Sequence, residues 1–181
     1  MSKSLLITGG AASGKSRWAA TYFSACDYVL YLKAGGEIDS DTLRRIEFSN
    51  KHNGVEWDIV TSEKSDLSDE ITDHKFVIFD SLSSYALAVL SEMFPGEEKP
   101  GDDMKKAIEK RIIEGIMKIR EKVDENGGSM IIITLETGLS VTPENKRQAA
   151  FREIMGIVNQ RIANTSEEVY FSASGIQFKI K

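Results

Sequence analysis

A glycine-rich segment near the N-terminus has the residue types and the spacing of a phosphate-binding loop. It follows the pattern G-x-x-x-x-G-K-[ST] and consists of Gly9, Gly10, Ala11, Ala12, Ser13, Gly14, Lys15 and Ser16. The glycines let backbone N–H groups turn inward toward phosphate oxygens. Lys15 supplies a cation for the β- and γ-phosphates, and the Ser16 hydroxyl can bind Mg²⁺. The segment predicts binding of a nucleoside triphosphate, ATP or GTP, together with Mg²⁺.

An aspartate at the end of an apolar run is the natural partner of this loop. Asp80 follows residues 76–79, which are continuously apolar, and a carboxylate at that position can hold Mg²⁺ opposite Ser16. The alternative is that Asp80 caps a following helix, since Ser81 and Ser83 come next. We favour the metal role because a phosphate loop needs a metal ligand of this kind.

Three further side chains are candidates for chemistry. Glu136 follows the apolar run 130–134 and could orient a substrate hydroxyl or a water molecule, or it could be an exposed loop acid. His52 and His74 are the only histidines. For His74, beside Asp73, we predict a solvated position in a loop.

The elements that must position these residues alternate between strands and helices. A short strand over 4–8 precedes the loop, and a helix over 16–23 follows it. Two helices are indicated by apolar residues three and four apart, one from Met104 to Val123 and one from Phe151 to Ile162 starting near Thr142 and Pro143. Further strands are predicted at 28–32, 76–79, 130–134, 169–171 and 177–180, the last two forming a C-terminal hairpin. This alternation predicts one α/β domain over 1–181, with a mostly parallel sheet flanked by helices.

Composition restricts the partners and the location of the chain. The net charge of −5 argues against general nucleic-acid binding. No apolar stretch approaches the roughly 20 residues of a membrane span. A single cysteine excludes an internal disulfide, and no signal-peptide core is present. We therefore expect a cytoplasmic protein with small-molecule substrates.

The phosphate loop, Asp80 and the C-terminal third together resemble one enzyme family. It is the bifunctional adenosylcobinamide kinase/adenosylcobinamide-phosphate guanylyltransferase family of cobalamin biosynthesis. A middle match lies at Arg44, Arg45, Ile46 and Trp57. The most specific match is a C-terminal pattern made by Val141, Pro143, Glu144, Phe151, Arg152, Glu153, Gly156, Asn159, Gln160 and Ala163.

The resemblance implies a RecA-like P-loop fold, a homo-oligomer that is a trimer in the family, and a corrinoid substrate. It also implies two reactions, phosphorylation of adenosylcobinamide and transfer of GMP through a histidine. Nucleotide contacts are implied for the phosphate loop, Asp80, Lys33, Ala34 and Gly35, and for Glu63 if the alignment is shifted by two residues.

The chain departs from the family at the histidine that accepts GMP, because Ser49 stands in its place. A serine lacks the imidazole nitrogen that forms the covalent intermediate. His52, one helical turn further on, could replace it only if the backbone shifts. We therefore expect an adenosylcobinamide kinase in which guanylyl transfer is an open question. The alternatives are a P-loop kinase of another small metabolite and a non-catalytic nucleotide-binding regulator.

Overall fold

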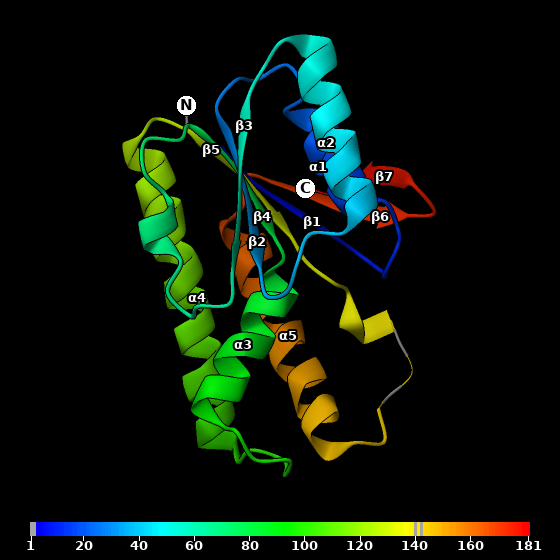
Figure 1. The fold of residues 1–181 in the computed structure, drawn as a ribbon. Helices are drawn as coiled ribbons and strands as arrows, with labels where there is room; N and C mark the ends of the chain where they lie inside the picture. The colour runs from blue at the N-terminus through cyan, green and yellow to red at the C-terminus, as the bar shows by residue number, and fades with distance from the viewer. Residues whose placement is uncertain (1–2, 140, 142) are drawn as a thin grey trace.

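A seven-stranded sheet forms the centre of the molecule in a computed structural model that describes residues 3–139, 141 and 143–181 (Figure 1). The strands are β1 (Lys3–Gly9), β2 (Val29–Ala34), β3 (Trp57–Ser62), β4 (Phe76–Asp80), β5 (Ser129–Ile133), β6 (Glu168–Ala173) and β7 (Ile176–Lys179). The helices are α1 (Lys15–Tyr22), α2 (Ser40–Asn53), α3 (Leu82–Met93), α4 (Asp102–Glu125) and α5 (Lys146–Thr165), with short 3₁₀ turns η1 (Ser68–Glu70) and η2 (Thr137–Leu139).

The strand order is β3-β2-β4-β5-β1-β6-β7, and every neighbouring pair is parallel except the C-terminal hairpin of β6 and β7. β5 thus lies between β1, which leads into the phosphate loop, and β4, which ends at Asp80. This order brings the carboxyl ends of the central strands to one edge, where open parallel sheets bind ligands. The predicted RecA-like α/β fold with a C-terminal hairpin is confirmed.

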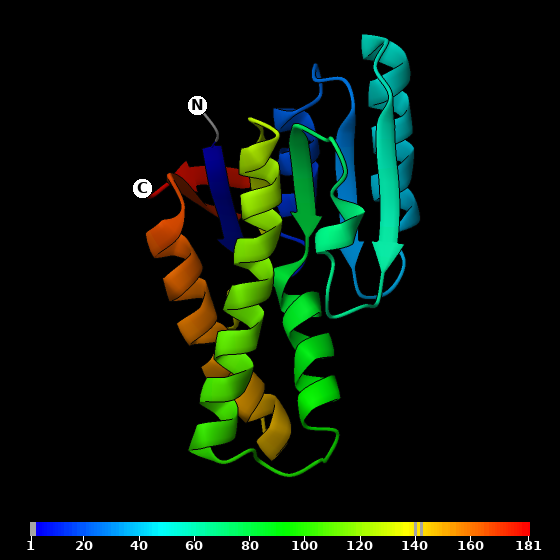
Figure 2. The ribbon, with the colours of Figure 1, turned by 90° about the vertical axis from the view of Figure 1, so that its left-hand side faces the viewer.

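Each face of the sheet has its own apolar core because alternate side chains of a strand point to opposite faces. Leu5, Ile7 and Tyr31 pack with residues of α1 and α2. Leu6 and Phe79 pack instead with residues of α3, α4 and α5. Figure 2 shows these last three helices covering one face and running beyond the carboxyl ends of the strands.

The predicted boundaries need two corrections. β2 does not end at residue 32 but extends to Ala34, because Lys33 pairs with both β3 and β4 and Ala34 pairs with β3. The last long helix does not start near Pro143 but at Lys146, since Asn145 accepts a hydrogen bond from the Gln148 N–H and so caps the helix. Thr142 lies outside the described residues.

The predicted solvated position of His74 is wrong. His74 is 5% exposed and lies in the segment that directly precedes β4. Its ring nitrogens are hydrogen-bonded to Asp58 at 2.8 Å and to Thr72 at 3.2 Å, and its ring stacks on Tyr28. A buried imidazole is acceptable here because both nitrogens have partners. Among the described residues, no helix is long and apolar enough to cross a membrane.

A glycine in the middle of α4 allows close packing of α3. A β-carbon at Gly115 would come within 1.9 Å of the Tyr85 hydroxyl, which donates a hydrogen bond to the Ser65 carbonyl oxygen at 2.9 Å. We predict that Gly115→Ala lowers the free energy of unfolding by about 1–3 kcal/mol, because Tyr85 must move and give up this bond. Urea denaturation measures the change.

The matched control for this prediction is Gly156→Ala on α5, where a β-carbon has open space. That variant should raise the free energy of unfolding by roughly 0.5–1 kcal/mol, since alanine is the better helix former. Equal effects of the two substitutions would contradict the packing role of Gly115.

Candidate functional site

The phosphate loop connects β1 to α1, and two of its positions can be occupied only by glycine. Gly9 has φ 148°, and a β-carbon there would lie 2.3 Å from the Ser172 carbonyl oxygen. Gly14 has φ 96° and precedes the first turn of α1. Both backbone conformations are strained for residues with a side chain. The loop shape is therefore a direct consequence of the glycine spacing.

The C-terminal hairpin supports this loop from outside, which the sequence did not reveal. The Ser172 hydroxyl donates to the Ser13 carbonyl oxygen at 2.6 Å, and the Gly175 N–H donates to the same oxygen at 3.0 Å. Gln177 in turn donates to the Ser172 hydroxyl at 3.1 Å. Residues near the end of the chain thus fix the conformation of a loop near its start.

Lys15 lies folded over the loop and is only 7% exposed. Its ammonium group donates to the carbonyl oxygen of Gly9 at 3.0 Å and to that of Gly10. Burial lowers the pKa of Lys15 below its usual range, and the charge of Asp80 opposes this shift. An anionic phosphate group bound in the loop would compensate the positive charge of this buried ammonium group.

Asp80 is 6% exposed, and groups from two elements converge on its carboxylate. The Tyr31 hydroxyl donates to Oδ2 at 2.5 Å, the Ser16 hydroxyl donates to it at 3.3 Å, and the Lys33 ammonium lies 3.6 Å away. Burial raises the pKa of Tyr31, and Asp80 raises it further, so Tyr31 stays a hydrogen-bond donor. Ser81, not Asp80, caps α3 by accepting from the Ser84 N–H at 3.2 Å. The carboxylate is therefore left to face the phosphate loop.

A cavity of about 480 Å³ opens between the phosphate loop and the start of α2. Its walls include Asp39 and Asp41, with Arg17 and Arg45 providing positive charge. A smaller cavity of about 110 Å³ adjoins it, sharing Ser16, Arg17, Thr42 and Arg45, and reaches Ser49 on α2. Ser49 thus lines a cavity that adjoins the phosphate loop.

Lys33, Ala34 and Gly35 lie at the carboxyl end of β2. Lys33 pairs in register with Asp80, and the Gly35 N–H donates to the Ser62 carbonyl oxygen at 2.8 Å. Glu63 follows Ser62 directly and is exposed. These four predicted contact residues therefore occupy one edge of the sheet, next to Asp80.

The two remaining candidates differ in their distance from the loop. Glu136 lies beside it, since its N–H donates to the Gly9 carbonyl oxygen at 3.1 Å and its carboxylate accepts from the Gly138 N–H. His52 is exposed in the last turn of α2, where its ring is stacked on Phe48. It lines neither of the cavities beside the loop. The structure brings Glu136 to the site and leaves His52 outside it.

The donors present fit Mg²⁺ bound together with a nucleotide. Within the part of the chain that the structure describes, no three His, Cys, Asp or Glu side chains form a metal cluster. Mg²⁺ at nucleotide sites, however, takes one or two protein oxygens and fills its remaining positions with phosphate and water. The Ser16 hydroxyl and the Asp80 carboxylate, 3.3 Å apart, supply such a pair.

A parallel α/β sheet whose first strand leads through a glycine-rich loop into a helix defines a P-loop protein. Within this class, the model of the family described as "Cobinamide kinase / cobinamide phosphate guanyltransferase" matches residues 5–180, so the chain belongs to that family.

Two relatives are similar to this chain over nearly its full length. The "Bifunctional adenosylcobalamin biosynthesis protein CobU" of Escherichia coli K12 is 29% identical over 98% of this chain and 99% of its own. The protein of the same description from Salmonella typhimurium LT2 is 27% identical over 98% of this chain and 99% of its own.

The hydrogen bond from Tyr31 to Asp80 generates a prediction about metal binding. Tyr31→Phe removes a donor from a buried carboxylate that faces Ser16. We expect the Mg²⁺ concentration needed for half-maximal binding of a nucleoside triphosphate to rise roughly three- to tenfold. Titration calorimetry at several Mg²⁺ concentrations measures it.

The matched control is Tyr85→Phe, which removes a buried tyrosine hydroxyl bonded to Ser65 in the α3 core. It should lower stability without changing the Mg²⁺ dependence. The same Mg²⁺ shift in both variants would rule out a specific role for Tyr31.

Proposed function

We propose that the chain is a nucleotide-dependent adenosylcobinamide kinase. The observation that supports it most is the complete phosphate loop, with Lys15 and the Ser16–Asp80 pair beside it, in a chain of the cobinamide kinase family. Phosphoryl transfer depends mainly on positioning and charge compensation, and these residues provide both. The nucleotide is ATP or GTP, and Mg²⁺ is its partner.

In this proposal each residue of the loop has a defined task. The loop N–H groups and Lys15 bind the β- and γ-phosphates, and Ser16 and Asp80 hold Mg²⁺. When bound, Mg²⁺ neutralises charge on the phosphate oxygens. Lys33, Ala34, Gly35 and Glu63 contact the nucleotide at the adjacent strand ends.

The reaction is an in-line displacement on the γ-phosphorus. The hydroxyl oxygen of the aminopropanol arm of adenosylcobinamide forms a bond to phosphorus, and the bond to the β–γ bridging oxygen breaks. The products are adenosylcobinamide phosphate and a nucleoside diphosphate, and the hydroxyl proton is released. Glu136 orients the hydroxyl from the side of Gly9.

The second family reaction, guanylyl transfer, lacks its usual nucleophile here. Ser49 accepts a hydrogen bond from the Asn53 side chain at 3.2 Å, and no basic side chain is hydrogen-bonded to it among the described residues. His52 is stacked on Phe48 and exposed. We therefore propose that no histidine–GMP intermediate forms at this position.

The kinase proposal is tested with adenosylcobinamide as acceptor and ATP or GTP as donor. The wild-type chain should form adenosylcobinamide phosphate, as measured by chromatography, and Lys15→Ala should lower kcat/KM by roughly 100-fold or more because the phosphate charge is no longer compensated. Turnover in Lys15→Ala equal to that of the wild type would sink the mechanism. Transfer to other small hydroxyl compounds only would favour a kinase of another metabolite.

Incubation with α-labelled GTP tests the proposal that no histidine–GMP intermediate forms. The protein should carry no acid-labile, hydroxylamine-resistant GMP adduct, since such an adduct requires a nitrogen nucleophile and Ser49 offers only a hydroxyl. His52→Ala distinguishes the sources of any label that appears. An adduct present in the wild type and lost in His52→Ala would overturn the proposal and assign guanylyl transfer to His52.

A further inference from the structure

A glycine on the exposed side of α5 has no structural explanation within the chain. Glycine inside a helix is destabilising, so it usually marks a place where something approaches the backbone closely. Gly115 on α4 fits this rule, because Tyr85 occupies the space. At Gly156, no described atom outside the helix backbone and the adjoining residues lies within 4 Å of where a β-carbon would be. The space above Gly156 is open.

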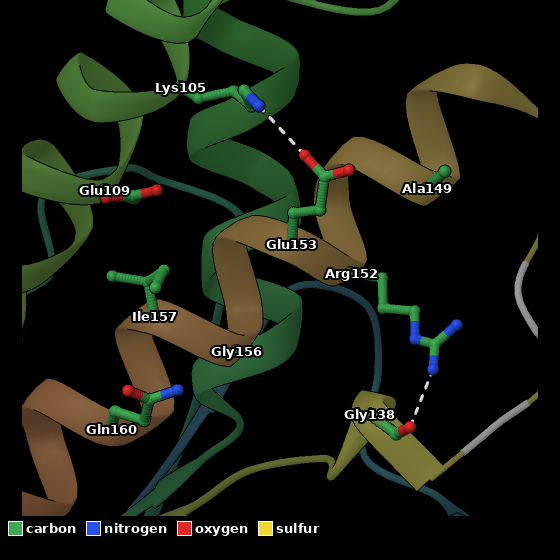
Figure 3. Close-up of a pocket in the computed structure, with 9 residues that line it drawn as sticks. All are labelled: Lys105, Glu109, Gly138, Ala149, Arg152, Glu153, Gly156, Ile157 and Gln160. Atoms are coloured by element: carbon green, nitrogen blue, oxygen red, sulfur yellow. Dashed lines mark hydrogen bonds and ion pairs between the residues drawn. The ribbon is translucent and has the colours of Figure 1, made fainter.

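This space is part of a groove of about 640 Å³ between α4, α5 and η2 (Figure 3). Figure 3 shows Gly156 between Arg152 and Gln160 on one wall, with Glu109 and Lys105 of α4 opposite. Arg152 donates to the Gly138 carbonyl oxygen at 2.7 Å, which ties η2 to α5. The groove is therefore held in shape by bonds within its own walls.

The groove continues inward to the phosphate loop. A second cavity of about 350 Å³ shares Gly138, Gly156 and Gln160 with it and reaches Thr8 and Glu136. Thr8 is 8% exposed, and its hydroxyl has no hydrogen-bond partner among the described residues. Glu136 is bonded through its N–H to Gly9. The inner cavity thus joins the open groove to the start of the phosphate loop.

The lining indicates the chemistry of the ligand. Positive and negative side chains alternate, and Lys105 is already paired with Glu153 at 2.9 Å. Such a wall, with charges of both signs, favours neither a cationic nor an anionic ligand but offers both donors and acceptors of hydrogen bonds. Primary amides, which donate and accept, match this pattern. A corrinoid ring carries many such amides and needs a wide, open site.

We infer that the groove between α4 and α5 binds the corrinoid ring of the acceptor, and that the inner cavity admits the arm that carries its hydroxyl. This inference rests on the proposed kinase function. Gly156 lets the ring approach the backbone of α5, and Thr8 and Glu136 meet the arm beside Gly9. The nucleotide binds on the other side of the loop, in the cavity next to α2.

Filling the groove tests this assignment. Gly156→Leu places a side chain in open space on a helix, and leucine is a better helix former than glycine, so the fold is retained. We expect the KM for adenosylcobinamide and the Kd for cobinamide, from equilibrium dialysis read by visible absorption, to rise roughly tenfold. The KM for the nucleotide should stay unchanged. Gln160→Ala, which removes an amide shared by both cavities, should raise the same two constants without adding bulk.

The control is Ala107→Leu, which adds the same side chain to an exposed position of α4 outside the groove lining. It should leave both constants unchanged.

An active wild type whose corrinoid constants are unaffected by Gly156→Leu and Gln160→Ala would overturn the groove assignment alone. A wild type that binds cobinamide in a Gly156-dependent way without phosphorylating it would overturn the kinase proposal alone. A change of oligomeric mass in Gly156→Leu with unchanged corrinoid binding would assign the groove to contact between copies of the chain, against the inference.

Discussion

The burial of the Asp80 carboxylate is the constraint around which the candidate site is organised. A nearly buried carboxylate is stable only with hydrogen-bond donors or cations around it, and here they come from β2 and the start of α1. Because Lys33 pairs in register with Asp80, a slip of one residue between β2 and β4 would turn both Lys33 and Tyr31 to the opposite face. One charge therefore couples sheet register, the beginning of α1 and the shape of the phosphate loop.

The two proposed substrate sites lie on opposite sides of the sheet and meet only at its carboxyl edge. The cavity beside the phosphate loop belongs to the α1–α2 side, whereas the groove of Gly156 belongs to the α4–α5 side. The segment after β5 connects them, because Glu136 is bonded to Gly9 and lines the inner cavity. In-line transfer requires donor and acceptor to approach the γ-phosphorus from opposite directions, and this arrangement provides two such approaches.

The sequence predicts the parts of this site whose signals are local. The glycine spacing of the loop, the apolar run before Asp80 and the strand before Glu136 are continuous in the chain, so the sheet edge follows from them. Strand β3, by contrast, is not predicted from the sequence. It contains Asp58 and Thr61, and as an edge strand it lacks a clear alternation of apolar and polar residues. The burial of His74 depends on this strand, since Asp58 supplies its partner. The role of Tyr31 could not be predicted, because a tyrosine in an apolar strand looks like a core residue. Only the structure shows that its hydroxyl is bonded to Asp80.

The support of the phosphate loop by the C-terminal hairpin has a consequence for how the protein is made. β1 lies between β5 and β6, and the Ser13 carbonyl oxygen is held by residues of β6 and of the turn that follows it. The loop is therefore synthesised well before β5 and β6, which supply the neighbours of β1 and the outer support of the loop. Such a long separation between partners in the sequence slows folding and leaves apolar β1 without its sheet neighbours until β5 and β6 have been made. The nascent chain therefore lacks the outer support of the phosphate loop until β6 and the turn after it have been made, and apolar β1 is open to aggregation until then.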